Sequence, residues 1–347
     1  MIKSPLFDRL ISQSVQKSIP LNVLFELTYN CNLNCWHCYR VIDHKRLELS
    51  LSEIKSILDQ LKEAGTLFLN LTGGEIFTRD DFFEIAEYAR SKAFAVRLLT
   101  NGTLITPRIA ERIKELYPLE VDISLYGAKE NTHDAVTGVG GSYQKVIQAV
   151  KELSKRQVKT FLKVTLMREN IDEYKEIIVL AKDLGVRCLF YPTISPRNDG
   201  AADPLCHQVE PENLEKYFND IMQSEKKHIL VERKVDLNEA PCNTGHCSLA
   251  ISPYGDVFPC VQLLIKLGNL REVPFHQIWR CEELKKIRSI KIGDLPDCAS
   301  CPLLAYCSRC PGIALLEDGD LMGPSKSACD LAQIRHKAEQ KLSKEVM

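Results

Sequence analysis

The stretch NVLFELTYNCNLNCWHCY, residues 22–39, decides how the rest of the chain is interpreted. Its first seven residues are mostly apolar and include Val, Phe and Thr, which favours a short buried strand. Cys31, Cys35 and Cys38 follow this strand in a C-x3-C-x2-C spacing. Three thiolates from one small loop can bind three irons of a four-iron cluster, and the fourth iron is then free to chelate a small molecule.

Cysteines are concentrated in two parts of the chain. Of the 14 cysteines, three fall within residues 31–38 and nine within residues 242–329. In a cytosol that keeps thiols reduced, such clustering indicates metal ligands rather than disulfides. A zinc site in the first loop, with His37 or His44 as its fourth ligand, is the alternative that the spacing leaves open.

Composition excludes several classes of function. The 347 residues are 45% hydrophobic and 26% charged, and 45 Lys and Arg face 46 Asp and Glu for a net charge of -1. A strongly basic face is not required, so nucleic acid is not expected as a partner. No apolar run of about 18 residues indicates a membrane span, and the N-terminus lacks the apolar segment of a signal peptide. We therefore expect a cytoplasmic protein.

Short β-rich runs alternate with amphipathic helical segments over the first two hundred residues. Ser50 and Glu53 form a capping-box pattern at one helix start, Thr106 precedes Pro107 at another, and Ile171, Tyr174, Ile178 and Ala181 are expected on one face of a third. Six β–α repeats predict an α/β fold, a partial (β/α)6 TIM-like barrel or a doubly wound sheet, because a closed barrel needs eight. The predicted strands are residues 22–28, 66–72, 94–100, 119–125, 159–166 and 186–192.

Small and polar residues stand where these strands end. Thr28 leads into the cysteine loop, Thr72 into Gly73-Gly74-Glu75, and Thr100 into Asn101-Gly102, while Ser124 closes the fourth strand. The carboxyl ends of parallel strands lie on one side of such a fold and form its ligand-binding face. We therefore expect these residues to meet at one rim.

The sequence changes character after about residue 193. A turn-rich loop is followed by one predicted helix, residues 211–227, and then by a segment rich in Cys, Pro and Gly that cannot bury much apolar surface without metal. The expected organisation is an N-terminal extension (1–20), the barrel (21–200), a linker with a helix (201–240), and a Cys-rich domain that ends in a helix (241–347).

The motifs and their order resemble the radical S-adenosylmethionine (SAM) superfamily. The resemblance covers residues 21 to about 200 and rests on CNLNCWHCY (31–39), Gly73-Gly74-Glu75, TNGTL (100–104), DISLYG (122–127) and HDAVTGVGGSY (133–143). It implies a [4Fe–4S] cluster on Cys31, Cys35 and Cys38. It also implies SAM contacts by Gly73, Gly74, Glu75, Asn101 and Ser124, with Glu75 and its backbone near the methionine amino group. Reductive cleavage of SAM would then produce a 5′-deoxyadenosyl radical that abstracts hydrogen.

One position departs from the family's pattern. Members often carry an Arg near Thr137, where it suits the methionine carboxylate, and this chain has a neutral Thr. Lys163 or Arg197 is the expected replacement.

The C-terminal cysteines resemble those of a SPASM domain, although a pair of zinc-ribbon sites is the alternative for C-x2-C pairs. The resemblance implies two auxiliary [4Fe–4S] clusters, the first on Cys242, Cys247, Cys260 and Cys310 and the second on Cys298, Cys301, Cys307 and Cys329. Cys307 and Cys310 are separated by two residues where the usual pattern has three, which leaves this partition open.

SPASM-bearing radical enzymes mostly modify peptides, so the resemblance implies crosslinking or decarboxylation of a ribosomally made peptide. It also implies an external electron donor of the flavodoxin or ferredoxin type. Because only about 20 residues precede the first strand, a leader peptide would need a separate leader-recognition protein or direct docking. The alternatives are tetrapyrrole side-chain oxidation or decarboxylation, sulfatase-type maturation, and a non-catalytic Fe–S or zinc protein. Val261 follows Cys260 where the sulfatase-maturing subfamily has an aspartate base, which disfavours that activity.

The catalytic base is not identified by the sequence. Tyr29, Asp122, Tyr191 and Asp203 are expected near the rim, and each has a structural role as its alternative. Cys206 is a weak candidate for a catalytic thiol, and no role beyond packing is predicted for Cys188 or Cys281.

Overall fold

Strand β1 (Asn22–Thr28) lies near the middle of one nine-stranded sheet in the computed structural model, which describes residues 5–225 and 235–346. Val23, Phe25 and Leu27 are fully buried on its outer face, as the alternating pattern of a strand predicts. The strand order is β6-β5-β4-β3-β2-β1-β7-β8-β9. The sequence thus placed β1 correctly, and the sheet shows how the rest is arranged around it.

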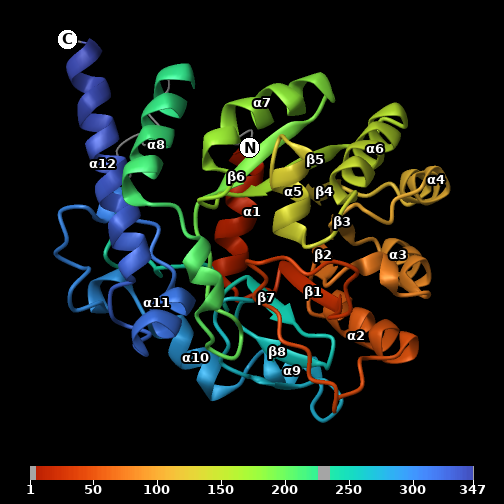
Figure 1. Cartoon of the computed structure of the whole chain (residues 1–347). Coiled ribbons are helices and arrows are strands. Elements are labelled where there is room, and N and C mark those ends of the chain that lie inside the picture. Colours follow the sequence, from red (N-terminus) through yellow and green to blue (C-terminus); the bar gives the residue numbers. More distant parts are fainter. Residues whose placement is uncertain (1–4, 226–234, 347) are drawn as a thin grey trace.

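Six consecutive strands pair in parallel and form the predicted partial barrel. The strands after β1 are β2 (Phe68–Gly73), β3 (Ala95–Thr100), β4 (Glu120–Ser124), β5 (Thr160–Thr165) and β6 (Arg187–Tyr191). Helices cover the convex face, as Figure 1 shows. They are α2 (Leu51–Glu63), α3 (Phe82–Ser91), α4 (Pro107–Glu115), α5 (Glu130–Thr137), α6 (Ser142–Lys155) and α7 (Tyr174–Asp183), with 3-10 turns at Ile76–Thr78 and Ile171–Glu173.

Local signals start and stop these helices. The predicted capping box of α2 is present, because the Ser50 side chain accepts from the Glu53 backbone and the Glu53 carboxylate accepts from the Ser50 N–H at 2.8 Å. The Thr106 hydroxyl caps α4, and Pro107 occupies its first turn. Gly65 follows α2 with a φ of +92°, a conformation that costs glycine least.

One residue of a predicted helix face was placed wrongly, whereas Ile171, Tyr174 and Ala181 are buried as predicted. Ile178 is 38% exposed, whereas Ile177 is fully buried together with Tyr174 and Ala181. The helix α7 begins at Tyr174, and counting three and seven residues from that start places Ile177 and Ala181 on the core side. Ile171 lies in the preceding 3-10 turn, which changes the phase of the pattern.

The C-terminal region continues the barrel sheet. Strand β7 (Ser248–Ile251) pairs in parallel with residues 22–25 of β1, and β8 (Asp256–Phe258) and β9 (Gly268–Asn269) extend the sheet antiparallel. Buried apolar residues of this region, among them Ile251, Val257 and Phe275, belong to the same core cluster as the barrel. The two parts of the chain therefore share one hydrophobic core.

Helices and 3-10 turns alternate with the cysteine-bearing loops in the rest of the chain. After the 3-10 turn at Asp203–His207 come α8 (Pro211–Glu225), α9 (Phe275–Ile278), α10 (Glu282–Ser289), 3-10 turns at Ile292–Asp294 and Leu304–Tyr306, α11 (Pro311–Asp318) and α12 (Lys326–Val346). Helix α12 packs along α8 (Figure 1). It starts before Cys329, so that cysteine lies in its first turn. Residues 226 and 227 of the predicted helix lie outside the described residues.

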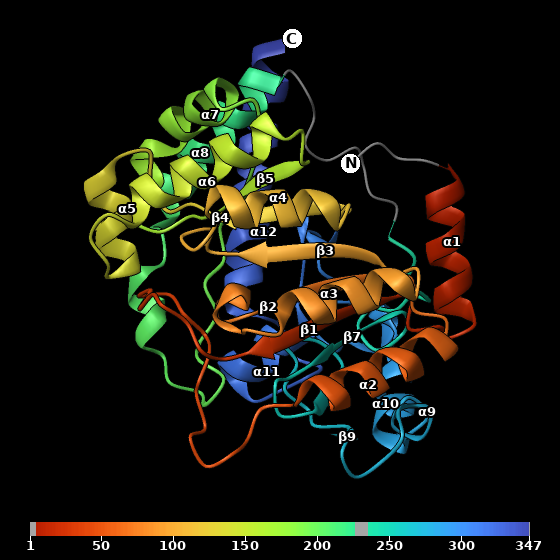
Figure 2. The same cartoon turned by 90° about the vertical axis from the view of Figure 1, so that its right-hand side faces the viewer.

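The helix α1 (Pro5–Gln16) stands at the end of the barrel where the strands begin, away from their arrowheads (Figure 2). The sequence had treated residues 1–20 only as an extension. Among the residues that the structure describes, no helix is both long and apolar enough to cross a bilayer.

Candidate functional site

The first cysteine loop follows β1 and is fastened to the end of α5. The Asn34 N–H donates to the Thr137 carbonyl at 2.9 Å, and the Trp36 N–H donates to the Val136 carbonyl at 3.1 Å. These two bonds use carbonyls that a helix end leaves without partners. The loop therefore has a defined backbone path between the two hydrogen bonds.

The three thiols of this loop lie near one another at the wall between two cavities. Cys31, Cys35 and Cys38 line both the barrel cavity, of about 350 Å³, and an outer cavity of about 330 Å³. Burial, together with charge repulsion from Cys38 and Cys31, raises the pKa of Cys35 to about 12. Proximity of this kind suits thiolates that share a positively charged group.

The geometry of these thiols fits a cluster. Within residues 5–225 and 235–346, no three His, Cys, Asp or Glu side chains converge tightly enough to hold one metal ion. Each thiolate of a four-iron cluster binds a different iron, so its ligands stand farther apart than those of one zinc ion. The half-buried, mutually close thiols at a cavity wall are compatible with the larger group.

Arg40 is a neighbour of these thiols that the sequence analysis missed. Its guanidinium donates to the Tyr29 carbonyl, and the Cys38 and Cys31 thiolates act on it strongly enough to raise its pKa despite burial. A basic residue directly after CNLNCWHCY was the available signal. Arg40 brings a positive charge to the loop and lines both cavities.

Gly73 and Gly74 allow β2 to end against the loop after β1. A Cβ on Gly73, whose φ is +129°, would stand 2.2 Å from the Thr28 carbonyl oxygen, and one on Gly74 would stand 2.0 Å from the Asn30 carbonyl oxygen. The Gly74 and Glu75 N–H groups donate to these same two carbonyls, at 2.6 and 2.9 Å. Only glycine permits this approach, which joins the two strand ends.

Glu75 is buried and turned toward β3. Its carboxylate accepts from the Thr100 hydroxyl at 2.7 and 2.9 Å, from the Asn101 N–H at 2.7 Å and from the Phe77 N–H at 3.2 Å. Burial raises its pKa although these bonds oppose the shift. The side chain does not line the barrel cavity, whereas Gly73 and Gly74 do. In this structure its carboxylate therefore positions the ends of β2 and β3.

Asn101 connects β3 to the cysteine loop. Its amide nitrogen donates to Asn32 Oδ1 at 2.9 Å and lies 3.7 Å from the Cys31 sulfur. Its side-chain oxygen accepts from the N–H and the hydroxyl of Thr103, at 2.9 and 2.6 Å. Its amide thus provides a hydrogen-bond donor beside one cysteine, a contact of the kind that tunes cluster potentials.

The barrel cavity joins the predicted strand-end residues. Gly73, Gly74, Asn101 and Ser124 all line it, together with the three thiols. Val261 and Gln262, next to Cys260, contribute to the same wall. The cavity therefore extends from the first cysteine loop to the C-terminal cysteine region.

Charged side chains line the interior of the barrel below this rim. Asp122 on β4 is 1% exposed, and its Oδ2 lies 2.7 Å from Arg97 Nη2 and 3.9 Å from Lys163 Nζ. Its Oδ1 has no hydrogen-bond partner. The Lys163 ammonium also lies over the Tyr191 ring at 4.9 Å. Burial raises the pKa of Asp122 and lowers that of Lys163, because it disfavours the charged form of each group. A polar ligand in the cavity would stabilise both charged forms.

The position that lacks the family's Arg does not face the cavity. Thr137 is fully buried, and its hydroxyl shares a hydrogen bond of 2.7 Å with Ser142 between α5 and α6. Of the two expected replacements, Lys163 lines the barrel cavity, whereas Arg197 pairs with Asp203 at 2.7 Å and lines the outer cavity.

The remaining candidates are divided between sites. Tyr191 lines the barrel cavity, whereas Tyr29 lines the outer one and donates its hydroxyl to Glu26 at 2.9 Å. His37 faces the barrel cavity and His44 the outer one. Cys206 is exposed and lines a third cavity, between α8 and α12, which includes none of the first three thiols.

Four C-terminal cysteines surround one place. Burial raises the pKa of Cys247, Cys260 and Cys310, and the Cys242 thiolate raises it further in each of the three. A close backbone approach helps to bring Cys260 and Cys310 together, because a Cβ on Gly312 would stand 2.3 Å from the Gln262 carbonyl oxygen.

A second set of four forms nearby. Burial raises the pKa of Cys329, and Cys307, Cys298 and Cys301 raise it further. The thiols that act on one another are thus those that the family pattern groups together, and the partition stays a prediction because the Cys307–Cys310 spacing is short. Cys188 and Cys281 belong to neither set and pack against the core.

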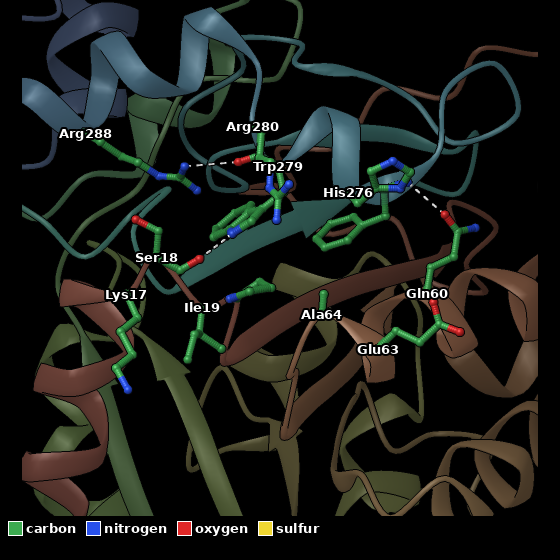
Figure 3. Close-up of a pocket in the computed structure, with 12 residues that line it drawn as sticks. Lys17, Ser18, Ile19, Gln60, Glu63, Ala64, His276, Trp279, Arg280 and Arg288 are labelled. Carbon is green, nitrogen blue, oxygen red and sulfur yellow. Dashed lines mark hydrogen bonds between the residues drawn. The ribbon is translucent and has the colours of Figure 1, made fainter.

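A fourth cavity, of about 410 Å³, lies at the opposite end of the barrel, where residues 18–20 enter β1 (Figure 3). Trp279 Nε1 donates to the Ser18 carbonyl at 2.5 Å, and Arg288 donates to the Trp279 carbonyl at 3.0 Å. These bonds fasten α9 and α10 to the chain before β1. The described cysteines do not line this cavity.

The comparisons agree with this fold and site. The Radical SAM superfamily pattern matches residues 25–199, and the pattern of the SPASM iron–sulfur cluster-binding domain matches residues 242–311. The chain therefore belongs to the radical SAM superfamily and carries a SPASM region. Membership implies a [4Fe–4S] cluster with SAM, and auxiliary Fe–S clusters in the C-terminal region.

Its relatives perform different reactions. An AdoMet-dependent heme synthase from Methanosarcina barkeri is 29% identical over 87% of this chain and 94% of its own length. The mycofactocin maturase MftC from Mycolicibacterium smegmatis is 30% identical over 81% of this chain and 75% of its own. Streptococcus suis SuiB, solved with its precursor peptide SuiA, superposes with a TM-score of 0.72 at 17% identity, over 95% of this chain and 82% of its own.

Proposed function

We propose that this enzyme uses SAM-derived radical chemistry to oxidise a ribosomally made peptide, by crosslinking or decarboxylation. One observation carries the proposal: the barrel cavity is lined both by Cys31, Cys35 and Cys38 and by Val261 and Gln262, beside Cys260. Hydrogen abstraction leaves a substrate radical, and an oxidation is complete only when a further electron leaves. A cavity that reaches both cysteine regions suits such a reaction.

Different residues of the chain would bind the cluster, contact SAM and receive electrons. Cys31, Cys35 and Cys38 would hold the SAM-binding cluster, which when bound supplies the electron that cleaves SAM. Gly73 and Gly74 would bring the β2 backbone against SAM, with Asn101 and Ser124 on the neighbouring strand ends. The buried Glu75 would keep the ends of β2 and β3 in register. The auxiliary sets in the C-terminal region would receive electrons.

Asp122 and Lys163 are our candidates for substrate contact. Both line the cavity, and the unpartnered Asp122 oxygen can accept a hydrogen bond or a proton while the Lys163 ammonium can hold a carboxylate. Clustered reduced thiols fit a cytoplasmic site of action, with a flavodoxin- or ferredoxin-type donor. A peptide substrate, with or without a separate leader-recognition protein, is supported by the names of MftC and of the SuiB complex.

The test is anaerobic reconstitution with iron, sulfide and dithionite, followed by SAM and the short peptides encoded beside the gene. We expect 5′-deoxyadenosine, and a peptide that has lost hydrogen or a carboxyl group by mass spectrometry. The Cys31→Ala variant is the control. No 5′-deoxyadenosine above that control would refute the enzymatic proposal, and 5′-deoxyadenosine without any peptide change would refute the peptide substrate.

Tetrapyrrole side-chain oxidation or decarboxylation is the second candidate. The heme synthase similarity, which extends over nearly the full length of that relative, favours it. Carboxylate-bearing side chains also suit Lys163, which lines the cavity. Incubation with carboxylated haem precursors in place of peptides separates the candidates. Sulfatase-type maturation gains no support from the cavity, because Val261 lines it where that activity places an aspartate.

A further inference from the structure

Arg309 lies between the two C-terminal cysteine sets. In the sequence it separates Cys307, of one set, from Cys310, of the other, and its backbone N–H donates to the Cys307 sulfur. Its side chain lines a small cavity together with Cys242, a member of the Cys310 set. Both the main chain and the side chain of Arg309 therefore face cysteines.

The guanidinium is anchored to two backbone carbonyls and also lies within hydrogen-bond reach of the Cys298 thiol. Its Nε donates to the Gly323 carbonyl at 2.8 Å, and its Nη2 donates to the Leu321 carbonyl at 2.6 Å and to the Gly323 carbonyl at 2.5 Å. Its Nη1 is buried without a hydrogen-bond partner. A fixed guanidinium with a desolvated N–H edge is suited to an anionic neighbour.

The positive charge of Arg309 acts on one thiol of each cysteine set. Burial raises the pKa of Cys298 and of Cys310, and the Arg309 charge opposes the shift in both. Two other arginines of the region act on different thiols. Arg335 acts on Cys307, and Arg288 acts on Cys281, which belongs to neither set.

We propose that Arg309 is a shared counter-cation of the two auxiliary iron–sulfur sites and raises the reduction potential of both. Reduction adds negative charge to a cluster, and a fixed nearby cation stabilises the reduced form. Because one guanidinium serves two sites, its removal shifts both potentials in the same direction. The proposal rests on the auxiliary clusters and is independent of the substrate.

The experiment is a redox titration followed by electron paramagnetic resonance. The full chain carries Cys31→Ala, Cys35→Ala and Cys38→Ala, so that only auxiliary clusters contribute, and Cys247→Ala and Cys329→Ala assign each signal to its set. We expect Arg309→Gln to move both midpoint potentials to more negative values. Arg309→Lys keeps the positive charge but loses the planar guanidinium and its several N–H donors. We therefore expect its midpoint potentials to shift in the same direction by a smaller amount.

Arg288→Gln is the matched control, because Arg288 also donates to two backbone carbonyls, that of Gly245 and that of Trp279, of which Figure 3 shows the second. We expect it to leave both potentials unchanged. Iron content is measured in every variant. Unchanged potentials in an iron-replete Arg309→Gln variant, or a shift of one site only, would overturn the proposal. If that variant loses iron, the absence of any shift in Arg309→Lys overturns it. No peptide or SAM is needed, so this outcome is separate from that of the proposed function.

Discussion

Gly74 shows how a single residue controls the rim. Because a Cβ there would stand 2.0 Å from the Asn30 carbonyl oxygen and 2.7 Å from Arg40 Nη1, Gly74→Ala must displace backbone as well as side chain. We expect a loss of about 1–3 kcal/mol of stability and about tenfold or more weaker SAM binding. Calorimetry of the reconstituted protein measures both.

Gly140→Ala is the control for this change, since its Cβ would meet nothing within 4 Å. It should leave stability within about 0.5 kcal/mol and SAM binding unchanged. Equal effects of the two substitutions would contradict the role of close approach at Gly74.

Glu26 is a buried charge behind the cysteine loop. It is 3% exposed and accepts from the Tyr29 and Tyr39 hydroxyls, each at 2.9 Å, while burial raises its pKa above 4.5. A raised folded-state pKa means that the folded protein holds this proton more tightly, so the wild type loses stability as pH rises from about 4.5 through the folded pKa.

Glu26→Gln removes that titration. The stability of this variant relative to wild type should therefore increase as pH rises from 4.5 through the folded-state pKa of Glu26, as measured by urea unfolding under anaerobic conditions. A difference that is constant with pH would show that Glu26 does not titrate differently on folding.

At the scale of single residues, the sequence predicted the positions of the functional glycines and cysteines better than it predicted the roles of the other side chains. The requirement for Gly73 and Gly74 follows from backbone approach, which a strand-end Gly-Gly pair indicates. The orientation of Glu75 toward Thr100 and the position of Arg40 depend on which side chains the fold places opposite them, and spacing along the chain does not contain that information.

Among the elements, the turn between α5 and α6 supports the cysteine loop. The Asp134 carboxylate accepts from the Gly141 N–H at 2.5 Å, from the Ser142 hydroxyl at 2.7 Å and from the Tyr143 N–H at 2.8 Å, at the start of α6. Burial opposes ionisation, but these bonds outweigh it and lower the pKa of Asp134. The same turn ends α5, whose carbonyls bind the loop.

Asp134→Asn should cost about 1–2 kcal/mol at neutral pH and reduce iron retention in the first loop. Because the folded-state pKa is lowered, the contribution of the carboxylate is present above pH 3.8 and lost as pH falls through the folded pKa. Thermal unfolding and iron analysis measure the two effects. Glu130→Gln, on the exposed side of α5, should change stability by less than about 0.5 kcal/mol, and an equal loss there would contradict the capping argument.

The whole molecule is organised by one sheet. Strand β7 covers the edge of β1, and Leu249, Ile251 and Phe275 extend the barrel core. Removal of residues 241–347 would expose an unpaired β1 edge and apolar surface, so we expect the truncated chain to aggregate during size-exclusion chromatography. A monomeric truncation that unfolds cooperatively would show instead that the barrel folds without the C-terminal region.

The sequence by itself determined the β–α order, the strand ends that carry the chemistry and the cysteine spacings. These features depend on local periodicity, turn residues and the fixed geometry of short loops. The tertiary structure alone decided that β7 pairs with β1, that the Arg309 side chain is anchored beside the C-terminal cysteines, and that Asp122 pairs with Arg97. Such contacts join residues far apart in the chain, and their geometry is set by packing of the complete fold rather than by local pattern.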